Sequence, residues 1–143
     1  MRVLVDADAC PVKGIIVAEA KKRGLSVTMV CDTCHKIADG YSSVVTVDKG
    51  ADSADLALAN LLLPGDAVVT QDYGVAALAL GKGAKAINPS GLVYDAKNMD
   101  TLLFERHMGQ KARRQNVRTK GPKKRSAKDD EAFLQNFIKL LDN

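Results

Sequence analysis

Carboxylates follow several of the apolar runs in this sequence. Asp6 and Asp8 come directly after the run Val3–Val5, and Asp72 follows the run Ala67–Thr70. A third group follows the run at 44–47 and consists of Asp48, Asp52 and Asp55. Grouped carboxylates repel one another, and a divalent cation is the simplest source of the free energy needed to hold them together. Because Mg²⁺ and Mn²⁺ prefer oxygen ligands, these residues predict a Mg²⁺ or Mn²⁺ site.

The elements that must position these acids alternate between strand-like and helix-like periodicity, as is typical of an α/β domain. The expected strands are Val3–Val5, Leu25–Val30, Val44–Val47, Ala67–Thr70 and Ala84–Ile87, and the first three expected helices are about Pro11–Arg23, Ala54–Leu63 and Val75–Leu80. The apolar strands lack a polar face, which favours a mainly parallel sheet of about five strands with helices on both faces. Ligands of such sheets bind beyond the carboxyl ends of the strands, where the acids fall. We therefore expect one three-layer domain over residues 1–143.

The last third of the chain differs in charge from the rest. Residues 106–128, the basic segment, hold ten of the 21 Lys and Arg residues and no Asp or Glu, whereas the other 120 residues hold 11 basic and 17 acidic side chains. The basic segment predicts salt-dependent binding to nucleic acid, and its alternative is a solvated segment that pairs with the acidic body. Apolar residues at helical spacing then predict a C-terminal helix over about 129–142. The side chains expected to contact nucleic acid are Thr70, Arg106, Arg113, Arg114, Lys123, Lys124 and Arg125.

The composition narrows the class of protein further. A hydrophobic content of 46% indicates a folded chain. No apolar run reaches the roughly 18 residues that a membrane span needs, and Asp6 comes too early for a signal peptide, so we expect a soluble cytoplasmic protein without a membrane partner. Cys31 to His35 fits short haem, thioredoxin and zinc patterns, but the surrounding sequence lacks the context that each pattern requires.

Three blocks of this chain resemble the signatures of the bacterial YaiI/YqxD family. They are Val-Asp-Ala-Asp-Ala-Cys-Pro at 5–11, Lys-Gly-Ala-Asp-Ser-Ala-Asp at 49–55 and Val-Thr-Gln-Asp-Tyr-Gly at 69–74. Residues 98–106, 113–114 and 121–123 match as well, so the resemblance covers nearly the whole chain. The family is similar to PIN and NYN nuclease-like domains. The resemblance implies a parallel sheet with helices on both sides and a carboxylate cluster that binds Mg²⁺ or Mn²⁺ for RNA cleavage.

The resemblance also assigns individual residues. Asp6 matches the acid that ends the first PIN strand, and Asp8 falls where these domains often have Asn or Asp. Residues 52–55 resemble the Gly-Val-Asp block of NYN domains, 55–59 resemble the PIN helix that starts with its acid, and 70–72 match the Thr-x-Asp block. The implied catalytic residues are Asp6, Asp8, Asp55 and Asp72, and the implied metal ligands are these four and Asp52. The glutamate that PIN domains usually supply between the first two acid blocks has no clear counterpart.

These observations predict a metal-dependent nuclease that hydrolyses phosphodiester bonds in RNA. One alternative is a non-catalytic RNA-binding protein of PIN-like fold, which the missing glutamate favours. A second is a haloacid-dehalogenase-type phosphatase, which also has Asp-x-Asp after its first strand but needs a later Asp at a strand end, whereas Asp66 precedes its strand. Each acid also has a purely structural interpretation as a helix cap. The sequence does not specify the oligomeric state.

Overall fold

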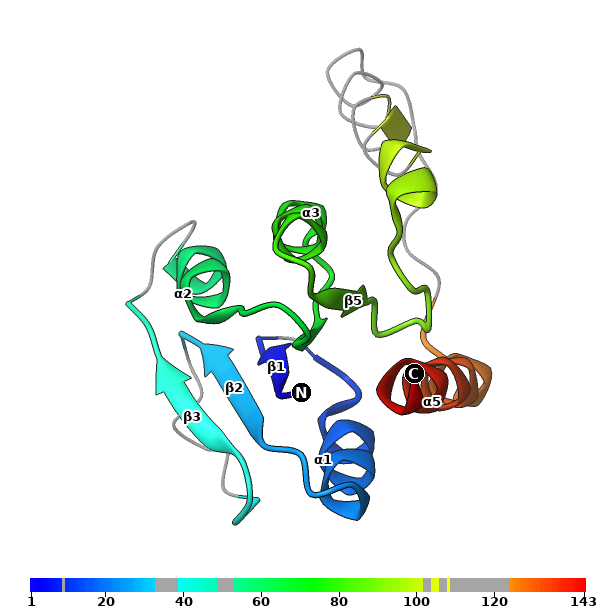
Figure 1. Ribbon diagram of the computed structural model, residues 1–143. Helices are drawn as coiled ribbons and strands as arrows, with labels where there is room; N and C mark the ends of the chain where they lie inside the picture. Colours follow the sequence, from blue (N-terminus) through cyan, green and yellow to red (C-terminus); the bar gives the residue numbers. More distant parts are fainter. Residues whose placement is uncertain (9, 33–38, 49–52, 102–103, 106–107, 109–123) are drawn as a thin grey trace.

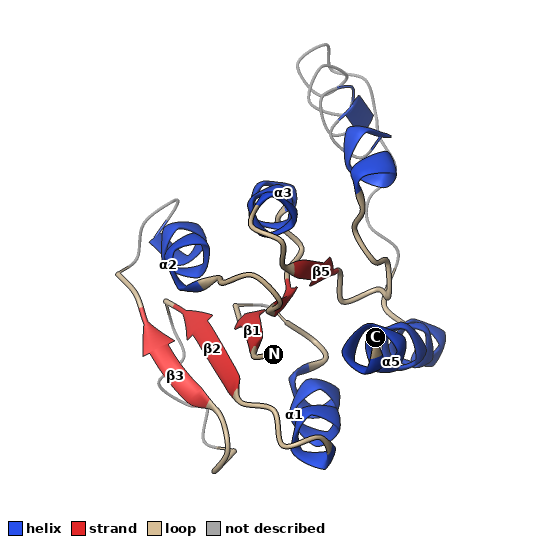
Figure 2. Cartoon of the chain, viewed as in Figure 1, coloured by secondary structure: helices blue, strands red, loops and turns tan. Residues whose placement is uncertain are grey.

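The computed structural model describes residues 1–8, 10–32, 39–48, 53–101, 104–105, 108 and 124–143. In these residues one parallel sheet has the strand order β3-β2-β1-β4-β5. Its strands are β1 (Val3–Asp6), β2 (Val27–Cys31), β3 (Ser43–Thr46), β4 (Ala67–Val69) and β5 (Lys85–Ile87). The helices are α1 (Lys13–Lys22), α2 (Ser53–Leu61), α3 (Tyr73–Gly81) and α5 (Ala127–Asp142), and residues 96–101 are also helical. Figures 1 and 2 show this arrangement.

Helices cover both faces of the sheet, with α1 and α5 on one side and α2 and α3 on the other (Figure 1). Successive side chains of a strand point to opposite faces, so Val5 belongs to the same core as Phe133 of α5, while Leu4 belongs to the same core as Leu58 of α2. Both cores consist of buried apolar side chains. The expected three-layer α/β architecture is confirmed, and the C-terminal helix begins at Ala127, two residues before its expected start.

The strand order decides which acids can meet. The chain runs outward from β1 to β2 and β3 and then returns to place β4 on the other side of β1. The order therefore reverses between β1 and β4, which is where open α/β sheets bind ligands. Strand β3 lies at an edge with largely exposed residues, so the expectation of burial on both faces fails there. Acids that follow β1 and β4 therefore lie next to each other. Acids that follow β3 leave the sheet two strands away from β1.

Asp66 lies at the opposite edge of the sheet from the ends of β1 and β4. Its Oδ2 lies 2.6 Å from Nη2 of Arg2 and accepts the Leu63 N–H at 3.0 Å. Burial alone would raise the pKa of Asp66, but these bonds outweigh it and lower the pKa. Asp66 thus joins the amino ends of β1 and β4, as its position before β4 predicts.

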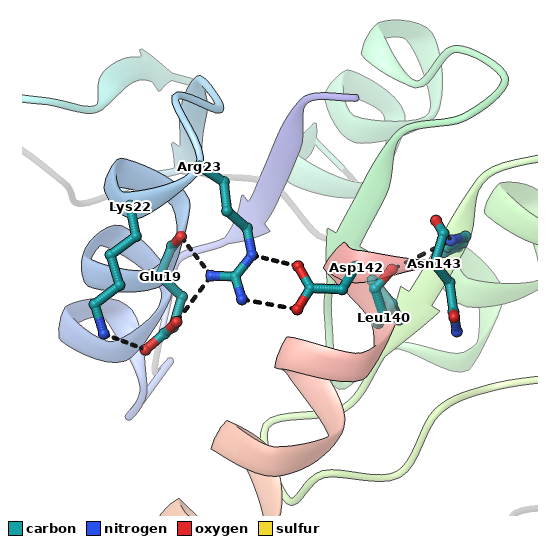
Figure 3. Close-up of polar contacts among 7 residues, drawn as sticks. Glu19, Lys22, Arg23, Leu140, Asp142 and Asn143 are labelled. Atoms are coloured by element: carbon teal, nitrogen blue, oxygen red, sulfur yellow. Dashed lines mark hydrogen bonds and ion pairs between the residues drawn. The ribbon is translucent and has the colours of Figure 1, made fainter.

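Arg23 connects α1 with α5, the two helices of one layer. Figure 3 shows its guanidinium between Glu19 and Asp142, with 2.9 Å from Nη1 to Glu19 Oε2 and 2.7 Å from Nε to Asp142 Oδ1. Hydrogen bonding to Arg23 is the main cause that lowers the pKa of both carboxyls. Glu19 is buried, so its charge depends on this partner.

Replacing Arg23 should reduce stability in a pH-dependent way. Because the folded-state pKa values of its two carboxylate partners are lowered, their contribution is present above the ordinary carboxyl pKa and is lost as the pH falls through the folded values. Arg23→Gln should therefore lower the Tm at neutral pH and flatten the dependence of Tm on pH below about 5. Circular dichroism melts across this range measure both effects. Lys22→Gln, which changes an exposed partner of Glu19, should do much less, and parallel pH profiles for wild type and Arg23→Gln would contradict the role of Arg23.

Candidate functional site

A pocket of about 320 Å³ opens at the carboxyl edge of the sheet. Its lining comes from the segments that follow β1, β4 and β5, and consists of Asp6, Asp8, Cys10, Gln71, Asp72 and Pro89. This is the crevice between β1 and β4, where the strand order reverses. Three of the predicted acids therefore share one pocket.

Thr70 connects two of these acids. Its side chain is buried, and its Oγ1 donates a hydrogen bond to Asp6 Oδ2 at 3.2 Å and accepts the Asp72 N–H at 3.0 Å. Its carbonyl accepts a bond from the Tyr94 hydroxyl at 3.2 Å, and that hydroxyl accepts a bond from the side chain of Asn88. The Thr70 hydroxyl therefore positions the acids, and it is not exposed for the direct contact with nucleic acid that the sequence suggested.

Asp72 is both a helix cap and a wall of the pocket. Its Oδ1 accepts the N–H groups of Gly74 at 2.7 Å and Val75 at 3.1 Å, so the capping interpretation is confirmed for this residue. A Cβ at Gly74 would lie 3.0 Å from that oxygen, which favours glycine next to the cap. Within the described part of the chain, Oδ2 of Asp72 has no hydrogen bond, so capping leaves one carboxylate oxygen for a ligand.

The charge on Asp6 is disfavoured by its surroundings. Burial is the main cause that raises its pKa, and repulsion from Asp8 and Asp72 raises it further, against the opposing effect of the Thr70 hydrogen bond. Asp8 is exposed and accepts the backbone N–H of Asp32 at 3.0 Å. A cation in the pocket would offset both the repulsion and the desolvation of Asp6.

Among the described residues, the other two predicted acids do not line this pocket. Asp55 lies in the first turn of α2 and, together with Asp72, lines a second pocket between α2 and α3. Asp48 is exposed beyond the edge strand β3. Asp52 lies outside the described residues.

Apart from Met108, the basic segment is described only at its end, from residue 124 onward. Lys124 is exposed, whereas Arg125 is held by Asp130, with 2.7 Å between Nη2 and Oδ1, and by the carbonyl of Pro89 at 2.9 Å. The end of the segment is thus fixed to the loop that supplies a wall of the pocket. The other predicted contacts, Arg106, Arg113, Arg114 and Lys123, lie outside the described residues.

Three lining residues are not among the site residues that the sequence predicts. Gln71 lies between Thr70 and Asp72, which are both predicted site residues. Pro89 follows the fifth strand and so reaches the same edge of the sheet. Cys10 adds a buried thiol, whose pKa is raised mainly by burial. The signal for Pro89 is its place after a parallel strand, and the signal for Cys10 is its place in the block at 5–11 that follows the first strand. Residues 33–38, which hold most of the cysteine-histidine motif, lie outside the described residues.

The loop after β5 is fixed against α5 by a glycine. Gly91 has φ +100°, and a Cβ there would lie 2.8 Å from the carbonyl carbon of Ala132. The Gly91 carbonyl accepts a bond from the Asn136 side chain at 2.7 Å. Any side chain at this position would push the loop that carries Pro89 away from α5.

Gly91→Ala should destabilise the fold by about 2 kcal/mol or more, because it combines an unfavourable backbone conformation with a backbone clash. Gly14→Ala is the matched control: Gly14 lies in α1 with open space around its Cβ position, so that change should be neutral or stabilising by about 0.5–1 kcal/mol. Urea unfolding measures both variants. Equal effects of the two changes would show that Gly91 has no special role.

The donor set suits a hard cation with few protein ligands. In the ranges that the structure describes, no three His, Cys, Asp or Glu groups are placed to hold a metal ion by themselves. Mg²⁺ commonly uses only one or two carboxylates and completes its shell with water and substrate phosphate. Asp6 and Asp72, which are half-buried and joined through Thr70, supply oxygens of that kind.

The protein is thus a three-layer α/β domain. Its acidic pocket is a candidate ion-binding site at the switch point of the sheet, the place between β1 and β4 where the strand order reverses. The sequence model of the family described as "Uncharacterized BCR, YaiI/YqxD family" matches residues 4–143, and the chain belongs to this family. A UPF0178 protein of Ruminiclostridium cellulolyticum is 60% identical over 141 residues, which cover 99% of this chain and 92% of the relative.

Other relatives align over nearly their whole length. UPF0178 proteins of Clostridium kluyveri and Clostridium acetobutylicum are each 50% identical over 143 residues, covering 94% and 97% of those proteins. No solved structure matches the chain. Among the described residues, no helix has the length and apolar character to span a membrane.

Proposed function

We propose that this protein is a metal-dependent nuclease that hydrolyses phosphodiester bonds, with RNA as its substrate. The observation that supports this most is the half-buried Asp6, which shares a pocket with Asp8 and Asp72 at the switch point of the sheet. Acids that repel one another where ligands bind are poorly explained by fold stability alone. They are the arrangement that a Mg²⁺ or Mn²⁺ ion would require.

Each residue of the pocket has a distinct part in this proposal. Asp6 and Asp72 would hold the cation, and Asp8, which is exposed at the mouth, would accept a proton from the attacking water or contribute a further oxygen. Thr70 keeps Asp6 and Asp72 in a fixed relation. When bound, the cation would activate a water molecule and stabilise the charge on the leaving oxygen.

The basic segment would supply the positive charge that the acidic pocket lacks. Nucleic-acid phosphates approaching a cluster of carboxylates need cations beside it, and ten Lys and Arg residues within residues 106–128 meet that need. Arg125 anchors the end of this segment through the Pro89 carbonyl at the pocket wall. A non-catalytic RNA-binding protein would need the same segment. It would not need the carboxylate of Asp6, whose negative charge is disfavoured by burial and by the nearby acids.

The proposal is tested with the purified full chain and labelled single-stranded RNA and DNA oligonucleotides. We expect RNA cleavage with Mn²⁺ or Mg²⁺, its loss with excess EDTA, and its return when Mn²⁺ is added back. RNA that is retained on the protein but stays intact under all these conditions would favour the RNA-binding alternative. If neither cleavage nor retention is seen, both functions are wrong.

A further inference from the structure

A second pocket adjoins the acidic one. It has a volume of about 550 Å³ and lies between α2 and α3, where its lining residues are Asp55, Leu56, Ala59, Asp72, Gly74, Val75, Ala77 and Leu78. We call it the α2–α3 groove. Asp72 lines both the groove and the acidic pocket, so the two cavities share a wall at this residue.

The groove exposes apolar side chains that the fold does not need on its surface. Leu56 is 63% exposed and Leu78 is 50% exposed, one on each of the two helices. Most of the lining is aliphatic, and its carboxylates come from Asp55 and Asp72. Binding sites for small organic groups commonly have this size and character, with an apolar wall and a few polar groups that fix orientation.

We propose that the α2–α3 groove binds a nucleobase of the substrate strand, adjacent to the phosphate held in the acidic pocket. This inference rests on the proposed function, since it needs a phosphodiester near Asp6 and Asp72. It adds a subsite and a requirement: the base that enters the groove must be unpaired.

A nucleobase fits the chemistry of the groove better than other occupants do. Its faces are apolar and can pack on Leu56 and Leu78. The exocyclic amino groups of guanine, adenine and cytosine can donate hydrogen bonds to a carboxylate such as that of Asp55. A hydrocarbon chain would have to pass the carboxylates without hydrogen-bonding to them. The connection through Asp72 also places the groove beside the phosphate, as the covalent link between a base and its phosphate demands.

The test compares ligands that differ only in the base. Guanosine 5′-monophosphate and ribose 5-phosphate are titrated with Mg²⁺ into the ¹⁵N-labelled full chain, and amide shifts are followed by NMR. We expect the nucleotide to bind about 10-fold more tightly, because burying one base against two leucines removes a modest apolar area from water. Leu78→Gln should bring this ratio close to one. Leu63→Gln, which changes another leucine, 55% exposed and absent from the groove lining, should leave the ratio unchanged.

The possible results separate the subsite from the function. Equal affinity of the two ligands for the wild type, with shifts near Asp6 and Asp72, would overturn the base subsite but leave the phosphate site. Shifts with neither ligand would count against the proposed function itself and the subsite with it. A wild-type dimer that Leu78→Gln converts to a monomer, measured by light scattering, would show that a second copy covers the groove and would also overturn the proposal.

Discussion

Asp6→Asn is expected to abolish metal-dependent RNA cleavage, with a loss on the order of 10³-fold or more, because several kcal/mol of transition-state stabilisation depend on the cation. Asn keeps the size of Asp6 and can still accept the hydrogen bond from Thr70. It removes the negative charge and replaces one of the two oxygens that would hold the cation with an amide nitrogen. The rate of cleavage of a labelled oligonucleotide under single-turnover conditions measures the effect.

The same variant should fold as well as the wild type or better. Burial and the nearby Asp8 and Asp72 raise the pKa of Asp6, so its charge costs folding free energy at neutral pH, and Asn removes that cost. A melting temperature equal to or above that of the wild type is therefore expected. Asp48→Asn is a matched control, because Asp48 is exposed and does not line the pocket, and it should leave cleavage unchanged. Undiminished cleavage by Asp6→Asn would show that the acidic pocket is not the catalytic site.

Phe133→Ala is expected to cost about 3–5 kcal/mol of unfolding free energy. Phe133 has no exposed surface, and its ring stacks on Phe137 with centroids 5.0 Å apart. It belongs to the core between the sheet, α1 and α5. Its backbone N is also one of the atoms that a Cβ added at Gly91 would meet. The loss of this ring therefore leaves a cavity in the core between the sheet, α1 and α5.

The chain offers a matched control for this change. Phe104 is 64% exposed, so Phe104→Ala removes the same atoms from solvent rather than from a core and should change stability by less than about 0.5 kcal/mol. Chemical unfolding of both variants measures the contrast. If both changes have similar small effects, α5 does not complete the core in the way described.

Much of the fold could be predicted from periodicity and turn residues. The five strands and the helices α1, α2, α3 and α5 occur where apolar runs and punctuating Gly or Pro residues placed them, because burial and backbone preferences act locally. The order of the strands was not accessible in this way. The spacing between strands is compatible with several orders, and only the assembled sheet shows that β1 and β4 are neighbours while β3 is at the edge.

Only part of the candidate site could be predicted, because its composition also depends on the order of the strands. Asp6, Asp8 and Asp72 meet because they follow neighbouring strands, whereas Asp55 lies in the first turn of α2 and lines the α2–α3 groove. Whether an acid caps a helix or faces a ligand depends on which oxygen is used, and Asp72 does both. The position of the Thr70 hydroxyl between two acids could not be read from the Thr-x-Asp pattern alone, since it depends on the pairing of β1 with β4.

Crystals of the full chain soaked in Mn²⁺ test most directly the claim that the acidic pocket holds a divalent cation. Anomalous diffraction should give a peak between the carboxylates of Asp6 and Asp72, at the roughly 2 Å distances typical of oxygen ligands to small divalent ions, and the peak should be absent from Asp6→Asn crystals. A wild-type pocket without a peak at saturating Mn²⁺, or a peak that persists in Asp6→Asn, would contradict the claim.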